Sequence, residues 1–291
     1  MILLANNKLA LEIASPGVEY AGSRFDWTGY IMQVSFGGRH LFCTKNSLVD
    51  KLGREGEGIC NEFGIDMPVG YEGIPSGEHF PKIGIGLLRK KGNERYSFEE
   101  QYDIQPCNFK QEEFESSAVF FAKQEKSNGY AYNYKKGIYL HSSGFEINYA
   151  LVNTGDRSLI TNEYAHNFLS FNKTVVNEHY HLEFFPDNFN VDPEEIVNPE
   201  NILNIKNNRC SFQKSFNEII FFSSKNNSNQ CIGWELKHHE KDILISENVS
   251  FSPSRVNLWC DSHVISPELY IALNIQPGEE MVWRRTYNFK A

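Results

Sequence analysis

A histidine inside an apolar, aromatic-rich run is the first place where this chain could do chemistry. His166 lies in the run 159–171, where Asn162 and Glu163 are further polar members. An imidazole changes charge near neutral pH, so it can give or take a proton. The same pattern also fits a histidine that only makes hydrogen bonds in a core or at its rim. The run 159–171 is therefore a candidate acid–base segment.

A second candidate is a carboxylate between apolar flanks near the end of the chain. Glu268 follows Val264-Ile265 and precedes Tyr270-Ile271-Ala272-Leu273. Flanks of this kind are usually buried, and burial raises the pKa of a carboxyl group towards that of a useful general base. A solvated strand end is the alternative interpretation of Glu268.

The elements that would position these groups are strands. Residues 145–152 alternate between apolar and polar types, which predicts a strand. Asn153-Thr154-Gly155-Asp156 has the composition of a turn. We therefore expect 145–152 and 159–171 to form a hairpin.

The rest of the chain predicts the same kind of architecture. Of its 291 residues, 41% are hydrophobic and 14% aromatic, and short apolar runs alternate with turn residues. Two such runs, 131–134 and 138–141, flank a predicted hairpin turn at 135–137. We expect an all-β fold, a large antiparallel β-sandwich, that forms a single domain over residues 1–291.

Composition argues against several classes of function. The net charge is −9 and the basic residues form no stripe, so we expect no nucleic-acid partner. No apolar run approaches the ~18 residues of a membrane helix, and 1–5 is too short an apolar start for a signal peptide. The six cysteines form no CxxC pair, which indicates reduced thiols. We expect a cytoplasmic protein that does not bind membranes.

The glycine-rich region and the histidine pairs bear on whether a cofactor or a metal is bound. The glycine-rich region 46–92 contains no phosphate-binding loop, so we expect no nucleotide and no other cofactor. His179 and His181 would share one face of a strand, which makes a metal site conceivable. No third ligand follows at a defined spacing, and we expect no metal.

Two segments together resemble the galactose mutarotase (aldose 1-epimerase) superfamily. The first is Tyr149-Ala150-Leu151-Val152-Asn153-Thr154-Gly155-Asp156, followed by His166, 11 residues after Gly155. The second is the C-terminal strand that presents Glu268, followed by Pro277-Gly278-Glu279 and Arg285-Thr286-Tyr287-Asn288-Phe289.

Other positions depart from the pattern of that superfamily. Asn61-Glu62 stands where its members have Asn-Arg, and 87–90 lacks the histidine of their Leu-His-Gly-Gly motif. Pro267 precedes Glu268, whereas the family motif has the proline after the glutamate. The chain is thus identified as a divergent member.

The resemblance implies an isomerase that interconverts the anomers of an aldose without metal, nucleotide or covalent intermediate. Glu268 would be the base and His166 the acid. The side chains that would hold hydroxyl groups or stack on the sugar are Asn167, Lys82, His79 and Trp234. Neither the sugar nor the oligomeric state follows from the sequence.

Two other functions remain open at this point. The missing arginine and second histidine favour a carbohydrate-binding protein that does not catalyse. Glycoside cleavage would need two carboxyl groups about 5–9.5 Å apart, for which Glu163 and Glu268 are the candidates.

Overall fold

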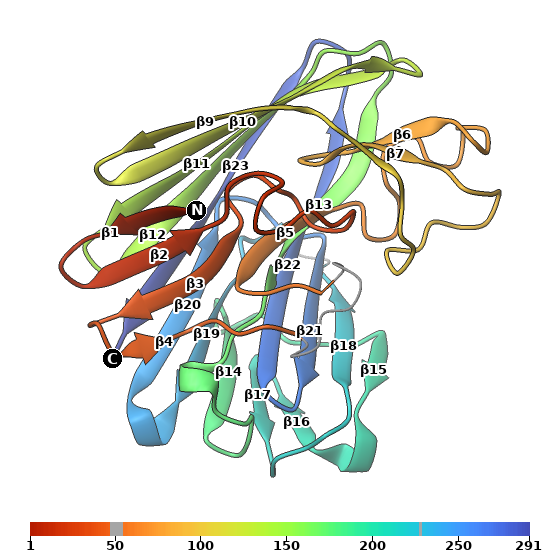
Figure 1. The fold of residues 1–291 in the computed structure, drawn as a ribbon. Coiled ribbons are helices and arrows are strands. Elements are labelled where there is room, and N and C mark those ends of the chain that lie inside the picture. The colour runs from red at the N-terminus through yellow and green to blue at the C-terminus, as the bar shows by residue number, and fades with distance from the viewer. Residues whose placement is uncertain (47–54, 227–228) are drawn as a thin grey trace.

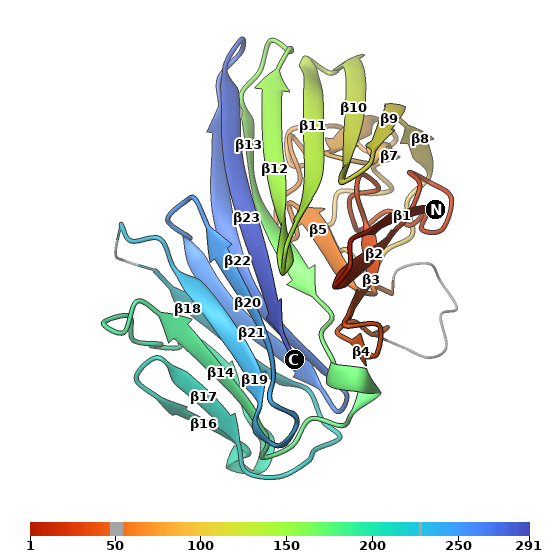
Figure 2. The ribbon, with the colours of Figure 1, turned by 90° about the vertical axis from the view of Figure 1, so that its left-hand side faces the viewer.

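The structure, a computed structural model, describes residues 1–46, 55–226 and 229–291. Two ten-stranded antiparallel sheets and a three-stranded sheet make up most of it (Figure 1). Turned by 90°, the molecule shows strands β12, β23, β20 and β19 in front of the other large sheet (Figure 2). The predicted all-β fold with large antiparallel sheets is confirmed. No helix of the described residues is long and apolar enough to cross a membrane.

One large sheet carries His166 and Glu268, and we call it the site sheet. Its strands, in spatial order, are β1 (Ile2–Ala5), β2 (Leu9–Ile13), β3 (Ile31–Phe36), β5 (Ile59–Phe63), β13 (Leu159–Asn167), β22 (Val264–Ile275), β21 (Arg255–Asp261), β18 (Ile220–Lys225) and β15 (Glu195–Val197). The short strand β4 (His40–Leu41) pairs with β3 off this path.

The other large sheet, the back sheet, covers the inner face of the site sheet. Its strands, in spatial order, are β16 (Leu203–Lys206), β17 (Arg209–Phe212), β14 (Tyr180–Phe185), β19 (Gly233–His238), β20 (Ile243–Val249), β23 (Glu280–Lys290), β12 (Gly144–Asn153), β11 (Tyr130–His141), β10 (Ser117–Ser127) and β9 (Asn108–Phe114). The third sheet contains β6 (His79–Lys82), β7 (Gly86–Arg89) and β8 (Ile104–Pro106). Within the described ranges, the short 3-10 helices are Phe171–Lys173, Pro199–Asn201 and His239–Lys241.

Alternation along the strands builds the core between the two large sheets. On β12, Phe145, Ile147, Tyr149 and Leu151 are all buried in that core, as the predicted period of two requires. On β22 in the opposite sheet, the inward residues include Leu269 and are equally apolar. Hydrophobic burial of these facing rows holds the two sheets together.

The predicted hairpin of 145–152 and 159–171 is wrong. β12 belongs to the back sheet and β13 to the site sheet, so the turn between them carries the chain from one layer to the other. The Asn153 amide stabilises this crossing, because it donates to the carbonyl groups of Arg157 and Ile275 and accepts from the Gly155 N–H. A strand pattern and a turn signal do not reveal which sheet the second strand joins.

The predicted hairpin turn at 135–137 is also wrong. β11 runs without interruption through these residues, and Gly137 pairs with Val119 on one side and Asn148 on the other. This position requires a glycine, because the Tyr139 ring lies over it, within 2.6 Å of where a Cβ would stand. The glycine thus marks a close contact within a strand and not a turn.

The core also contains buried charges that bridge the two sheets. Arg285 of β23 is fully buried and contacts Glu163 of β13 at 2.8 Å and Glu247 of β20 at 2.7 Å. Its guanidinium also donates to the Leu269 carbonyl of β22. Charges at this depth need partners of opposite charge, because desolvating each of them is costly.

Candidate active site

His166 lies on the solvent side of β13, opposite the buried ionic residues of the same strand. Its imidazole is 5% exposed and stacks on the Phe168 ring, with 3.9 Å between ring centroids and 4° between planes. The Phe25 ring meets it edge-on. The Nδ1 atom lies 3.0 Å from the Ser266 hydroxyl oxygen. These contacts fix the ring and leave Nε2 directed towards the neighbouring strand.

Glu268 lies on the neighbouring strand β22, directly beside this histidine. β13 and β22 pair Glu163 with Ile271, and the same register places His166 opposite Glu268. The imidazole Nε2 is 3.5 Å from Glu268 Oε1. The two predicted acid–base residues, distant in sequence, are therefore neighbours in space.

Hydrogen bonds orient the carboxyl group. The Ser266 hydroxyl donates to Glu268 Oε1 at 3.1 Å, and the Tyr270 hydroxyl donates to Oε2 at 3.0 Å. Since Ser266 has one hydrogen to give, it must accept a hydrogen bond from Nδ1–H of His166. In that tautomer, Nε2 carries the lone pair.

Burial shifts both groups away from their charged forms. Loss of solvent raises the pKa of Glu268 to about 7, against the lowering effect of the hydrogen bonds from Tyr270 and Ser266. Burial, reinforced by the positive charge of Arg24, lowers the pKa of His166 well below 6.5. The unliganded pair thus holds one proton at mildly acidic pH, and that proton is on Glu268.

Both side chains line a hollow of about 440 Å³ on the solvent side of the site sheet, which we call the site hollow. Its other lining residues include Arg24, Asp66, Phe98, Tyr164, Glu195, Phe221, Ser223, Arg255, Asn257, Trp259 and Tyr270. Aromatic and charged side chains outnumber the two isoleucines, Ile65 and Ile219, in this lining, which suits a hydroxyl-rich ligand.

Arg24 is a lining residue that the sequence did not single out. Its Nε donates to Glu62 Oε2 at 2.9 Å, and its guanidinium lies over the Phe98 and Phe25 rings. Tyr164 also donates to Glu62 Oε2. These partners are 38 and 140 residues away from Arg24, so no local pattern could have linked them. An arginine distant in the sequence thus stands beside Glu62 in the site.

The four residues predicted to hold the sugar do not line the site hollow. Asn167 points to the core, where its amide donates to the Pro267 carbonyl and accepts from the Tyr287 hydroxyl. Trp234 is fully buried between the sheets, and its indole N–H donates to Glu247. Neither side chain can touch a ligand on the outer face, so these two predictions are corrected. Odd-numbered residues of β13 face inwards, which excludes Asn167 once His166 faces outwards.

The other two residues predicted to hold the sugar are Lys82 and His79. Lys82 is buried and contacts Glu62 Oε1 and the Tyr96 hydroxyl, and burial lowers its pKa to about 8. It therefore contacts a partner of Arg24 and not the hollow itself. His79 begins β6 in the third sheet, where it pairs with Arg89.

Glu163 also lies away from the solvent side of the site sheet. It lies in the core in its ion pair with Arg285, on the side of β13 opposite to His166. Glu163 and Glu268 therefore do not face a common ligand, which removes this carboxyl pair as a basis for glycoside cleavage.

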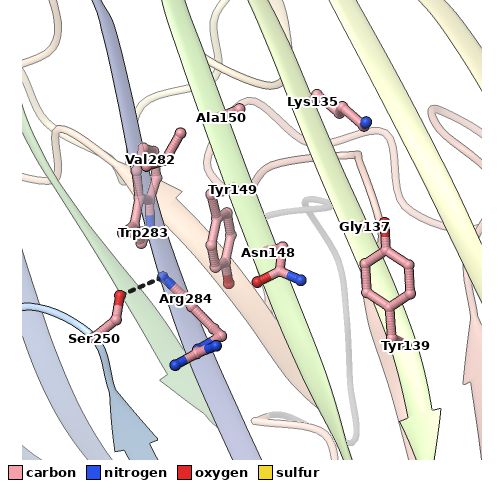
Figure 3. A pocket seen from close by; sticks show the side chains of 10 residues that line it. All are labelled: Lys135, Gly137, Tyr139, Asn148, Tyr149, Ala150, Ser250, Val282, Trp283 and Arg284. Atoms are coloured by element: carbon pink, nitrogen blue, oxygen red, sulfur yellow. Dashed lines mark hydrogen bonds between the residues drawn. The ribbon is translucent and has the colours of Figure 1, made fainter.

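A second hollow, of about 400 Å³, lies on the solvent side of the back sheet (Figure 3). Lys135, Tyr139, Asn148 and Arg284 are among its lining residues, and the Arg284 N–H donates to the Ser250 hydroxyl. None of the residues that line it is a histidine or a carboxylate. Among the residues that the structure describes, no group of three or more His, Cys, Asp or Glu could hold a metal ion. The site hollow is the candidate active site because it brings His166 Nε2 and Glu268 Oε1 within 3.5 Å of each other.

Known proteins with this architecture are found by structure and not by sequence. No protein-family model and no curated protein sequence matches the chain. A galactose mutarotase-like protein from Lactobacillus casei superimposes with a TM-score of 0.64 at 14% identity, covering 100% of both chains. A galactose mutarotase related enzyme from Lactobacillus acidophilus gives 0.61 at 11% identity, covering 100% of this chain and 97% of the other. An aldose epimerase homologue from Caenorhabditis elegans gives 0.57 at 9%, covering 99% and 98%.

Proposed function

We propose that this chain, which has the galactose mutarotase-like fold, interconverts the α and β anomers of an aldose. The observation that carries the proposal is the 3.5 Å approach of His166 Nε2 to Glu268 Oε1 inside a hollow. The ring oxygen and the C1 hydroxyl of a pyranose are bonded to the same carbon. Two proton-transfer groups side by side can therefore each reach one of these oxygens.

In ring opening, Glu268 takes the proton of the C1 hydroxyl while His166 gives one to the ring oxygen. The C1–ring oxygen bond breaks, and an aldehyde forms at C1. After rotation about the C1–C2 bond, the two transfers run in reverse and close the ring on the other face. His166 and Glu268 share one transferable proton throughout the reaction. The pair also holds one such proton in the free site at mildly acidic pH. The 3.5 Å contact lets that proton pass between the two groups.

Anomer-exchange NMR on α-glucose and α-galactose tests the proposal. His166→Gln and Glu268→Gln should each lower kcat/KM by roughly 10²–10⁴-fold, the usual contribution of one acid or base. His79→Gln is the matched control, because this histidine lies in the third sheet and should leave the rate unchanged. Exchange no faster than in buffer, or full activity without His166, would refute the proposal.

The second candidate is a carbohydrate-binding protein that does not catalyse. Two features favour it: the sequence lacks the arginine and second histidine of the mutarotase pattern, and the Nε of Arg24 is already paired with the Glu62 carboxylate. Sugar binding in a titration, with anomer exchange no faster than in buffer, would favour this candidate over the isomerase.

A further inference from the structure

The site hollow is longer than the acid–base pair requires. Glu268 pairs across the strands with Asn257, Asn257 with Ser223, and Ser223 with Glu195. All four line the hollow together with His166. From β13 to β15 this row crosses four strand spacings, or about 19 Å. A pyranose held by the acid–base pair occupies only one end of it.

An aromatic row borders this polar row. Trp259 and Phe221 are cross-strand partners on β21 and β18, and both line the hollow. Their strand neighbours Leu258 and Phe222 are buried in the core, so the two rings stand on the solvent side. The strands β22, β21, β18 and β15 follow one another across the sheet (Figure 1). A polar floor beside aromatic rings suits sugars, whose hydroxyl groups need partners and whose C–H faces stack on rings.

A buried amide in this row lacks a partner. Asn257 is 4% exposed, and its Nδ2 donates to the Tyr270 hydroxyl at 3.3 Å. Its Oδ1 accepts no hydrogen bond. An unpaired buried acceptor is unfavourable, and a hydroxyl group of a ligand is the kind of donor that would satisfy it.

We propose that the site takes a reducing oligosaccharide of at least two sugar units. The reducing-end unit lies at His166 and Glu268, and the next unit lies over Asn257, against Phe221, in the direction of Glu195. This inference rests on the proposed function, because it places the free hemiacetal at the acid–base pair.

The test compares glucose with maltose, cellobiose and lactose, which all end in a reducing glucose. Anomer-exchange NMR should give a kcat/KM at least about tenfold higher for one of these disaccharides than for glucose, the effect of one good aromatic contact. Phe221→Ala should abolish this advantage and leave the rate on glucose within about twofold. Phe221→Leu, which keeps apolar volume but loses the ring face, should act like the alanine variant. Phe114→Ala, at an exposed position on β9 of the back sheet, is the control.

Equal kcat/KM on all four sugars, or an advantage that survives Phe221→Ala, would overturn the inference. Anomer exchange on none of the four sugars would refute the isomerase proposal instead. Titration with the same sugars would then test whether the site hollow has two subsites. Binding of a disaccharide about tenfold tighter than glucose, and lost in Phe221→Ala, would support two subsites. Equal binding of all four sugars would overturn them.

Discussion

At the scale of single residues, the proton shared by His166 and Glu268 decides what the site can do. Neither group has the pKa of its free amino acid, because both are buried. Their opposite shifts disfavour two charges in the empty hollow. A bound sugar hydroxyl that donates to the carboxylate would favour the ionised form of Glu268, and with it the protonated imidazole.

The first prediction is a rate that falls as the pH rises through about 7. The working pair holds one proton, and the raised pKa of Glu268 means that this proton is lost above about pH 7. A second proton binds only below the lowered pKa of His166, so acid reduces the rate only well below pH 6.5. kcat/KM should therefore be level at mildly acidic pH and fall about tenfold per pH unit on the alkaline side.

The measurement is a pH profile of kcat/KM, corrected for the uncatalysed exchange and accompanied by circular dichroism at each pH. Activity that rises through pH 7 and stays high at pH 9 would contradict the one-proton pair. Such a result would indicate that the working form has an ionised carboxylate and a neutral imidazole.

At the scale of elements, the neighbouring strands β13 and β22 assemble the site, and Ser266 links them. Its hydroxyl contacts His166 Nδ1, Glu268 Oε1 and the Asn167 N–H, at 3.0–3.1 Å. One side chain thus sets the imidazole tautomer, one carboxylate oxygen and the spacing of the two strands.

The second prediction follows from this link. Ser266→Ala should lower kcat by roughly 10–100-fold with little change in KM, because it loosens the acid–base geometry without removing either group. Ser250→Ala, in the hollow of the back sheet, is the matched control and should be silent. Steady-state anomer exchange gives the split between kcat and KM. A change in KM alone would mean that Ser266 binds the sugar and does not position the pair.

The sequence predicts where strands lie but not which sheet each strand joins. The alternation of 145–152 and the apolar flanks of Glu268 were sufficient to predict strands, and β12 and β22 confirm them. The sheet that each strand joins depends on pairing with distant segments, as the crossing at Asn153 shows. Arg24 was missed for the same reason, since its partner Glu62 is distant in sequence. Asn167 and Trp234 were misplaced because composition does not show which face of a strand is buried.

At the scale of the whole molecule, the buried charges between the sheets connect the core to the site. Arg285 joins Glu163 and Glu247 from two sheets and donates to the carbonyl group of Leu269, the residue after Glu268. Burial raises the pKa of Glu247 even though Arg285 lies beside it. The two terminal nitrogens of one guanidinium thus join β13, β20 and β22, whereas its Nε has no hydrogen-bond partner.

The third prediction concerns this guanidinium. Arg285→Ala should lower the free energy of unfolding by roughly 3–5 kcal/mol, because it leaves two carboxylates buried without a cation. Arg284→Ala is a neighbouring control: its half-exposed side chain points to solvent and pairs with Glu146, so the loss should be about 0–1 kcal/mol. Urea unfolding at pH 7.5 measures both. Equal losses for the two variants would mean that the buried triad contributes nothing specific.

The alternation on β13 also limits how natural sequences of this kind can vary in length. Glu163 and Asn167 face the interior while Tyr164 and His166 line the site hollow, so a single inserted residue would exchange the two sets. Such an insertion would expose the ionic residues and bury the imidazole at once. Length changes within this strand should therefore be absent, or come two residues at a time, across homologues that keep the pair.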